Sequence, residues 1–244
     1  MSKHLQQIIL LLWMLGLVGP AQSAVFGVSP TRVTFDASHR SATVTITNND
    51  SEPVVIQAVV KSWTQVDGKD IYEPTRDVLI TPPVVTILPG AEQILRLGFR
   101  RPPSPQKEDA YRLYLQEIPP PPKPGFNGIG VALRVGVPVF VMSNKKLAPK
   151  PRWGVTYLAG EHALRVALTN VGTAHLQLYE FTLRALTGDA NLVHQTHGSY
   201  VLSGQHSEWI LKLDPTTHID STQLKLRVRT DAGDIEQTIE LDKP

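Results

Sequence analysis

The sequence predicts an all-β protein made of two β-sandwich domains. Short segments with alternating apolar and polar residues recur along the chain, and Gly, Pro, Asn and Asp separate them. No segment of about 11 residues or more repeats its apolar side chains with the 3.6-residue period of a helix. The chain also contains 20 prolines, which suit strand edges and corners and exclude long helices.

Residues 1–23 have the layout of a secretory signal peptide. The basic residue Lys3 precedes an apolar run from Ile8 to Val18, and small residues follow. This run is too short and wrongly flanked for a membrane span, with an uncleaved anchor as the alternative. Cleavage after Ser23, or one residue later, would lower the formal net charge from +2 to +1, because Lys3 is the only charged side chain removed. We therefore expect an exported protein.

Composition excludes several classes of protein. The nearly neutral charge lacks the basic excess of nucleic-acid-binding proteins, so no nucleic-acid partner is expected. The chain has no cysteine, so an exported form must be held together by burial instead of disulfides. Its length is sufficient for two hydrophobic cores of about 100 residues each.

The first predicted domain covers residues 24–143. In "ATVTITNND", Val44 and Ile46 alternate with threonines before an Asn-rich turn. "VVIQAVVKSWTQVDGKD" predicts a long β-branched strand that ends in a turn at Asp67-Gly68. "QILRLGFRR" and "YRLYLQEI" continue the alternation, and "GIGVALRVGVPVF" is the last strand of the domain.

The second predicted domain covers residues 144–244. It begins with "NKKLAPKPRW", a polar segment with prolines that predicts a short linker. Strands resume at Val155. The same alternation of apolar and polar residues then returns in four further segments, which are "ALRVALTNVG", "YEFTLRAL", "SEWILKL" and "LKLRVRTDAGDIEQTIEL".

The strand over residues 128–140 has two unlike faces. Every second residue from Ile129 to Val139 is aliphatic, whereas the opposite face begins with the small residues Gly130 and Ala132. The aliphatic row could form part of this protein's own core, or it could pack against another protein. A stiff run of prolines precedes the strand and either sets its reach or is an ordinary connector.

Several of these segments occur in an order that resembles the PapD-like family of periplasmic pilus chaperones. They are "VSPTRVTF", "VTITNND", "TPPVVTILPGAEQILRL", "YRLYLQEIPP" and the alternating strand. The resemblance covers essentially the whole mature chain, although the second domain matches mainly in length and pattern. "PTRDVLITPP" and "YRLYLQEIPPPP" look most like the archaic chaperone-usher branch.

This resemblance implies a fold, a location and a role. The family fold is two immunoglobulin-like sandwiches in a boomerang arrangement. Its members act in the periplasm without catalysis: each inserts an edge strand into a pilin subunit whose immunoglobulin-like fold lacks one strand. The capped subunit then passes to an outer-membrane usher. The resemblance also assigns the donor side chains to Ile129, Val131 and Leu133, while positions 135–139 of the aliphatic row are assigned to the domain's own core.

The family also uses a pair of cations to hold the C-terminal carboxylate of the subunit. Arg32 in "SPTRVTF" matches the first cation, but Pro138 stands where the family has its lysine. The resemblance therefore leaves three candidates for the anchor, with Arg112 as first choice beside Arg32 and Arg134. An arginine suits the task because its planar fork holds a carboxylate through two hydrogen bonds.

Nearby acids offer these arginines other partners, such as Glu117 and Asp109. Glu117 also matches the glutamate of the family's interdomain salt bridge, and Asp231 resembles its acidic partner. Met142 stands where the family has the linking arginine. We therefore expect other cations to hold the hinge: Lys145, Lys146 or Arg152.

No enzyme, cofactor, metal or small-molecule substrate is expected. The chain has neither a G-x-S-x-G motif nor a phosphate-binding Gly-rich loop. His194 and His197 form an H-x-x-H pair, but in a predicted polar loop without an acidic helix beside it. Two other functions remain open. A secreted all-β hydrolase would need paired acids in a cleft, and a secreted, self-associating adhesin or stalk module would need its own spare donor extension.

Overall fold

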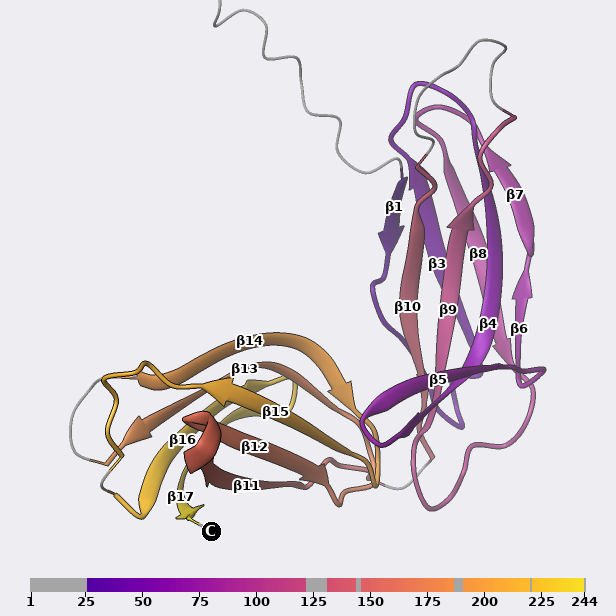
Figure 1. The fold of residues 1–244 in the computed structure, drawn as a ribbon. Coiled ribbons are helices and arrows are strands. Elements are labelled where there is room, and N and C mark those ends of the chain that lie inside the picture. The colour runs from indigo at the N-terminus through magenta and orange to yellow at the C-terminus, as the bar shows by residue number, and fades with distance from the viewer. Residues whose placement is uncertain (1–25, 122–130, 144–145, 187–190, 220, 244) are drawn as a thin grey trace, which may run out of the picture.

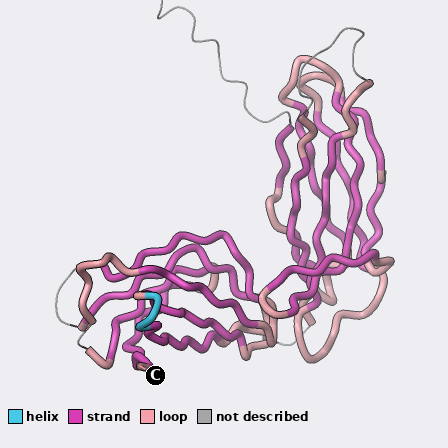
Figure 2. Tube along the Cα trace, in the orientation of Figure 1, coloured by secondary structure: helices cyan, strands magenta, loops and turns pink. Residues whose placement is uncertain are grey.

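The computed structural model describes residues 26–121, 131–143, 146–186, 191–219 and 221–243. Their regular structure consists of strands and one short 3₁₀ helix, η1 (Ala159–Glu161) (Figure 2). The predicted all-β class is therefore confirmed. None of the described helices is long and apolar enough to cross a membrane. The predicted signal peptide, residues 1–23, lies outside the described residues and stays a prediction.

Ten strands form two sheets in the first domain (Figure 1). One sheet has the order β1-β3-β8-β6; the other has the order β2-β10-β9-β4-β5, with β7 paired to β4. The bounds are β1 Phe26–Ser29, β2 Val33–Phe35, β3 Ser41–Asn48, β4 Val54–Val66, β5 Lys69–Pro74, β6 Val78–Thr81, β7 Val84–Ile87, β8 Glu92–Phe99, β9 Asp109–Glu117 and β10 Arg134–Val141.

Alternation places one face of each sheet in a shared core. Val44 and Ile46 of β3 are fully buried there, together with Leu113 and Leu115 of β9. The predicted turn at Asp67-Gly68 is confirmed: it joins β4 to β5, and both residues have positive φ values of 50° and 71°. Such values suit the tight turn of a two-residue hairpin.

The second domain contains β11 to β17 in the order β14-β13-β16-β17-β11-β12-β15. β17 joins two antiparallel groups through a short parallel contact with β11, and a separate core lies between them. The H-x-x-H pair lies on a strand, β14, so the predicted loop is wrong. The bounds are β11 Pro151–Leu158, β12 Ala163–Asn170, β13 Leu176–Ala185, β14 Asn191–Val201, β15 His206–Lys212, β16 Gln223–Thr230 and β17 Gly233–Asp242.

The two domains meet at an angle, and the β4–β5 hairpin crosses at the junction (Figure 1). The strands of the first domain end at Val141 and those of the second begin at Pro151. The boundary proposed at residues 143/144 falls in this interval. Near the junction, Arg112, Gly136 and Pro138 of the β2-β10-β9-β4-β5 sheet line a cleft together with residues of the second domain.

Candidate functional site

The N-terminal part of β10, from Arg134 to Pro138, has an open edge. β10 pairs with β9 along its whole length, whereas β2 pairs on the other side with Val139–Val141 alone. In the described part of the chain, no strand pairs with the second edge from Arg134 to Pro138. Backbone groups along such an edge are available to a strand from another chain.

Toward the C-terminal end of β10, its aliphatic face packs into this protein's own core. Val137 and Val139 are buried in the first core and Val135 packs partly against it, which confirms their assignment. The two described candidates for donor residues, Val131 and Leu133, precede β10, which begins at Arg134, so the strand starts later than the sequence predicted. They also differ from each other. Val131 is 81% exposed, whereas Leu133 packs partly against the same core.

Leu133 is also tied to β9 through its backbone. Its N–H donates to Glu117 Oε2 at 3.1 Å, and its carbonyl accepts from the Glu117 N–H at 2.9 Å. Leu133 is therefore partly in this protein's own core and partly exposed, which sequence parity alone did not predict. The third candidate, Ile129, lies outside the described residues.

The opposite face of β10 lines a cleft between the domains. The cleft has a volume of about 680 Å³, and Gly136 and Pro138 of β10 form part of its wall. A Cβ on Gly136 would lie 3.4 Å from Arg112 Cδ, so a larger side chain there would compete with Arg112 for space. The other lining residues are Thr31, Arg32, Arg112, Gln177, Tyr179, Tyr200 and Asp231.

Arg112 is enclosed by aromatic rings. Its guanidinium carbon lies 4.1 Å from the ring centroid of Trp63, 5.9 Å from that of Tyr72 and 5.7 Å from that of Tyr200. We call these three residues the Arg112 socket. Nη2 of Arg112 donates a hydrogen bond of 3.3 Å to the Tyr72 hydroxyl. Among the described residues no carboxylate forms an ion pair with Arg112, so the aromatic rings stabilise its charge.

The other two candidate arginines differ from Arg112. Arg32 pairs with Asp231 across the domains at 2.9 Å, and its second terminal nitrogen donates to Gln177 Oε1. Its charge is thus already matched by a carboxylate. The guanidinium carbon of Arg134 lies 3.9 Å from the ring centroid of Tyr114. Arg134 is on the same face of β10 as Gly136 and Pro138, but it does not line the cleft. The structure therefore brings Arg32 and Arg112 together, but not Arg134.

The interdomain salt bridge differs from the one expected. Glu117 lies at the end of β9 remote from the second domain and bonds Leu133, so its assignment to the bridge is wrong. Arg32 supplies the link to Asp231. Lys146 and Arg152 form no ion pair with a described residue, and Lys145 lies outside the described part. Lys146 and Arg152 therefore do not hold the hinge through an ion pair among the described residues, and the expectation for Lys145 stays a prediction.

His175 completes this network from the second domain. Its Nδ1 lies 2.7 Å from Glu108 Oε2, its Nε2 lies 3.3 Å from Asp231 Oδ2, and its ring stacks on Phe140 of β10 at 3.6 Å. Burial lowers the pKa of His175, but Asp231 and Glu108 outweigh burial and raise it above its ordinary value. Burial raises the pKa of Asp231, but His175, the Gln177 N–H and Arg32 lower it overall. No local motif around His175 indicated this role.

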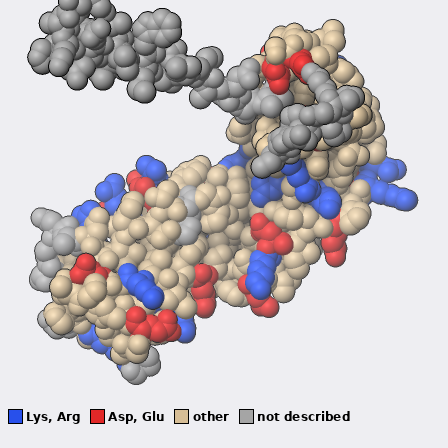
Figure 3. Space-filling model, turned by 45° about the horizontal axis from the view of Figure 1, so that its top comes forward, with Lys and Arg blue, Asp and Glu red and all other residues tan. Residues whose placement is uncertain are grey.

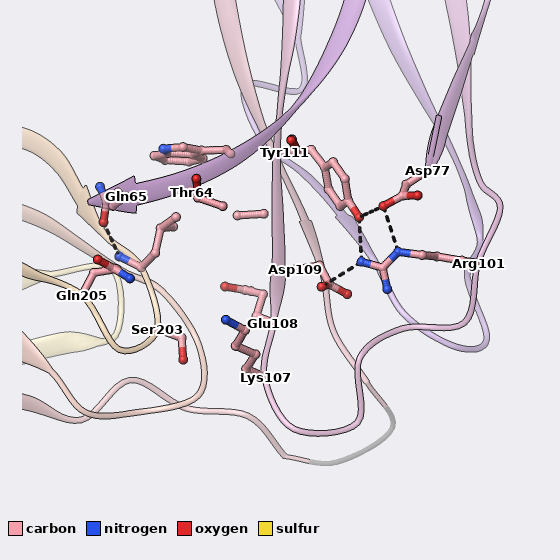
Figure 4. A pocket seen from close by; sticks show the side chains of 14 residues that line it. Thr64, Gln65, Asp77, Arg101, Lys107, Glu108, Asp109, Tyr111, Ser203 and Gln205 are labelled. Carbon is pink, nitrogen blue, oxygen red and sulfur yellow. Dashed lines mark hydrogen bonds and ion pairs between the residues drawn. The ribbon is translucent and has the colours of Figure 1, made fainter. Parts of the chain in front are cut away.

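A second pocket lies on the hairpin side of the junction (Figure 4). There Gln65 of β4 accepts the Leu202 N–H at 2.9 Å and donates to the Tyr200 carbonyl at 2.9 Å. Asp109 pairs with Arg101 at 2.9 Å, and is therefore not the partner of a candidate anchor arginine. The β4–β5 hairpin thus contacts the second domain directly and fixes one wall of the junction.

Lys and Arg side chains gather in the angle between the two domains, with Asp and Glu side chains beside them (Figure 3). Within the cleft only one of the two arginines, Arg112, has no carboxylate partner among the described residues. The cleft can therefore accept an anion next to the open edge of β10.

Comparison with known proteins places this geometry in a family. Residues 25–145 match the family of pili and flagellar-assembly chaperones, PapD N-terminal domain. The chain is 33% identical over 130 residues to the chaperone protein FaeE of Escherichia coli, covering 52% of this chain and 47% of that protein. It is 32% identical over 121 residues to the Escherichia coli chaperone protein PapD, covering 48% of each. The matches thus span about half the length of these curated relatives.

A solved structure extends the likeness in fold to both domains. It is the CsuC–CsuE chaperone–tip adhesion subunit pre-assembly complex from archaic chaperone-usher Csu pili of Acinetobacter baumannii. The TM-score is 0.64 at 21% identity, covering 91% of this chain and 100% of that chain. Both domains have the immunoglobulin-like fold that the sequence predicts. Through its N-terminal domain, this chain belongs to the PapD-like family of pilus assembly chaperones.

Proposed function

We propose that this protein is a periplasmic chaperone of the archaic chaperone-usher type that caps pilin subunits and delivers them to an outer-membrane usher. The single observation that carries the proposal is the open edge of β10, from Arg134 to Pro138, beside a cleft that holds Arg112. Family membership supports the same role. The role is binding, without catalysis, cofactor or small-molecule substrate.

Strand addition would use the open edge of β10 together with the aliphatic side chains of the segment that precedes it. Main-chain hydrogen bonds along the open edge would hold the subunit, and exposed aliphatic side chains would fill its groove. Fully burying an exposed aliphatic side chain contributes roughly 1.5–3 kcal/mol, and Val131, at 81% exposure, has nearly all of this still to gain. Leu133 would contribute less, because it is already partly buried. The costs of association and ordering reduce the net affinity.

Arg112 is the proposed anchor for the C-terminal carboxylate of the subunit. Its guanidinium faces the cleft without a carboxylate partner among the described residues, whereas Arg32 is matched by Asp231. Arg32 would then shape the cleft and hold the domain angle, and Arg134 would lie along the path of the subunit. A single arginine can replace a pair of cations because it offers two parallel hydrogen bonds.

Periplasmic co-expression with pilin subunits tests the proposal. Arg112→Ala should weaken capture of the subunit by about a hundredfold or more, because breaking one side of a desolvated ion pair costs about 3–5 kcal/mol and 1.4 kcal/mol is tenfold. Arg112→Lys should recover only part of the affinity. Arg96→Ala is the matched control, since Arg96 is exposed on β8 of the other sheet.

Two results would contradict the proposal. If Arg112→Ala captures the subunit as well as the wild type, the anchor is wrong. If the purified protein instead forms polymers with itself and captures no subunit, the self-associating module is the correct function.

A further inference from the structure

The carboxylate of Asp70 accepts hydrogen bonds from three residues, two of which belong to the Arg112 socket. Oδ1 accepts from Trp63 Nε1 at 2.9 Å and from Gln65 Nε2 at 2.8 Å, and Oδ2 accepts from the Tyr72 hydroxyl at 2.9 Å. The β4–β5 register brings these groups together, because Trp63 lies opposite Tyr72 and Gln65 lies opposite Asp70. One side chain thus connects two walls of the Arg112 socket.

The bond to Asp70 also determines what the Tyr72 hydroxyl can offer to Arg112. A hydroxyl has a single hydrogen, and at Tyr72 that hydrogen points to Asp70. The oxygen is therefore free to accept from Arg112 Nη2 at 3.3 Å. Burial raises the pKa of Tyr72 to about 12, so the hydroxyl stays protonated at neutral pH. Without Asp70 the hydrogen could turn toward the guanidinium, where it would repel the cation.

The third wall of the socket belongs to the second domain and is linked to the same carboxylate. Gln65, which donates to Asp70, also donates to the Tyr200 carbonyl and accepts from the Leu202 N–H. The Tyr200 ring stands edge-on to Trp63, with 5.3 Å between the ring centroids. The aromatic surfaces around Arg112 are therefore connected through Gln65 to Asp70.

We propose that Asp70 is a positioning residue for subunit binding, which holds the Arg112 socket so that the guanidinium presents its remaining N–H groups to the C-terminal carboxylate of a pilin subunit. This inference rests on the proposed role of Arg112. A guanidinium has five N–H donors, and the bond to Tyr72 uses one of them. Ordering the side chain before the subunit arrives lowers the entropy cost of binding.

Whether removing the charge of Asp70 weakens or strengthens subunit binding distinguishes positioning from simple electrostatics. Asp70 is an anion close to a site that would bind an anion, so removal of its charge should by Coulomb's law strengthen binding. Positioning predicts the opposite. In Asp70→Asn an amide N–H2 group replaces one of the two acceptor oxygens, so one bond to the socket is lost or reversed.

The experiment uses the pilin subunit captured by the wild-type chaperone, prepared with a free C-terminal carboxylate and as the C-terminal amide. We expect Asp70→Asn to bind the carboxylate form about tenfold more weakly, equivalent to about 1.4 kcal/mol. The amide form should bind the wild type and the variant equally. Asp67→Asn is the matched control: it removes the same charge at the turn of the same hairpin, and no hydrogen bond joins Asp67 to the described socket residues.

Each other outcome overturns the inference in a distinguishable way. If Asp70→Asn binds the carboxylate form as tightly as the wild type or more tightly, while Arg112→Ala binds weakly, the anchor stands and positioning by Asp70 is wrong. If Asp70→Asn weakens both forms equally, Asp70 has only a structural role. If the wild type does not distinguish carboxylate from amide, the proposed anchor fails first.

A second variant keeps the test valid if Asp70→Asn does not fold. Tyr72→Phe removes only the hydroxyl that accepts from Arg112 and keeps the ring of the socket. It should likewise bind the carboxylate form several-fold more weakly and leave binding of the amide form unchanged. Equal binding of the carboxylate form by Tyr72→Phe and the wild type would overturn the proposed arrangement.

Discussion

Replacing His175 with glutamine should loosen the contact between the two domains, and the effect should depend on pH. In the folded protein His175 lies between two carboxylates, Glu108 of the first domain and Asp231 of the second. The other groups that face its ring are Phe140 and Tyr200, while Arg32 reaches it only through Asp231. Two adjacent anions favour the protonated imidazole, which then links the domains as a cation.

The expected magnitude depends on what remains for each carboxylate. Asp231 keeps Arg32 at 2.9 Å and the Gln177 N–H at 2.8 Å, so it remains paired. The Glu108 side chain is 3% exposed, and among the described residues its carboxylate keeps only the backbone N–H of residue 175, at 2.9 Å. Breaking one side of a buried pair costs about 3–5 kcal/mol, and the remaining bond places the loss near the lower end, about 3 kcal/mol. If the domains unfold together, this lowers the melting temperature by about 6–12 °C.

The sign of the pH dependence follows from the raised pKa of His175. A group whose pKa in the folded protein exceeds its ordinary value of 6.5 contributes full stability below pH 6.5. That contribution is lost as the pH rises through the pKa of the folded state. The difference between the wild type and His175→Gln should therefore be largest in mild acid and should shrink in alkaline solution.

Calorimetric unfolding across this pH range is the assay. His194→Gln serves as the control, because His194 lies on the exposed face of β14 and forms no ion pair with a described carboxylate. Its melting temperature should stay near that of the wild type at every pH. A constant difference between His175→Gln and the wild type across the range would refute the ionic link and leave only the loss of stacking on Phe140.

Two further predictions concern capture of the subunit by β10. Val131→Asp should abolish capture and leave the melting temperature unchanged, because Val131 is 81% exposed; Leu133→Asp should lower both, because Leu133 also packs against the first core. If both variants lose capture but keep the wild-type melting temperature, the side chain of Leu133 contacts only the subunit and not the first core. Replacing the prolines of residues 119–122 with Gly-Ser repeats should weaken capture several-fold without unfolding the first domain, because consecutive prolines stay extended and lose little entropy on binding. Unchanged affinity in a titration would mean that this loop is only a connector.

What the sequence by itself determined is the local structure. Alternation identified the strands, and the Asp67-Gly68 pair identified the hairpin turn, because both depend on neighbouring residues alone. Parity put Val137 and Val139 on the aliphatic face, and the family resemblance assigned them to this protein's own core, where the structure places them. Parity could not separate Val131 from Leu133, since both have the same parity, and their burial depends on where the sandwich ends.

Only the tertiary structure decided how the domains meet and which candidate arginine lacks a carboxylate partner among the described residues. Arg32 and Asp231 are 199 residues apart, and Glu108 and His175 are 67 residues apart, so no local pattern could pair them. Glu117 was assigned to the bridge by its motif, but β9 carries it away from the second domain. The Arg112 socket likewise combines Trp63 and Tyr72 of the β4–β5 hairpin with Tyr200 of the other domain. Such contacts arise when two folded surfaces dock, and the energy of that docking depends on side chains from several strands at once.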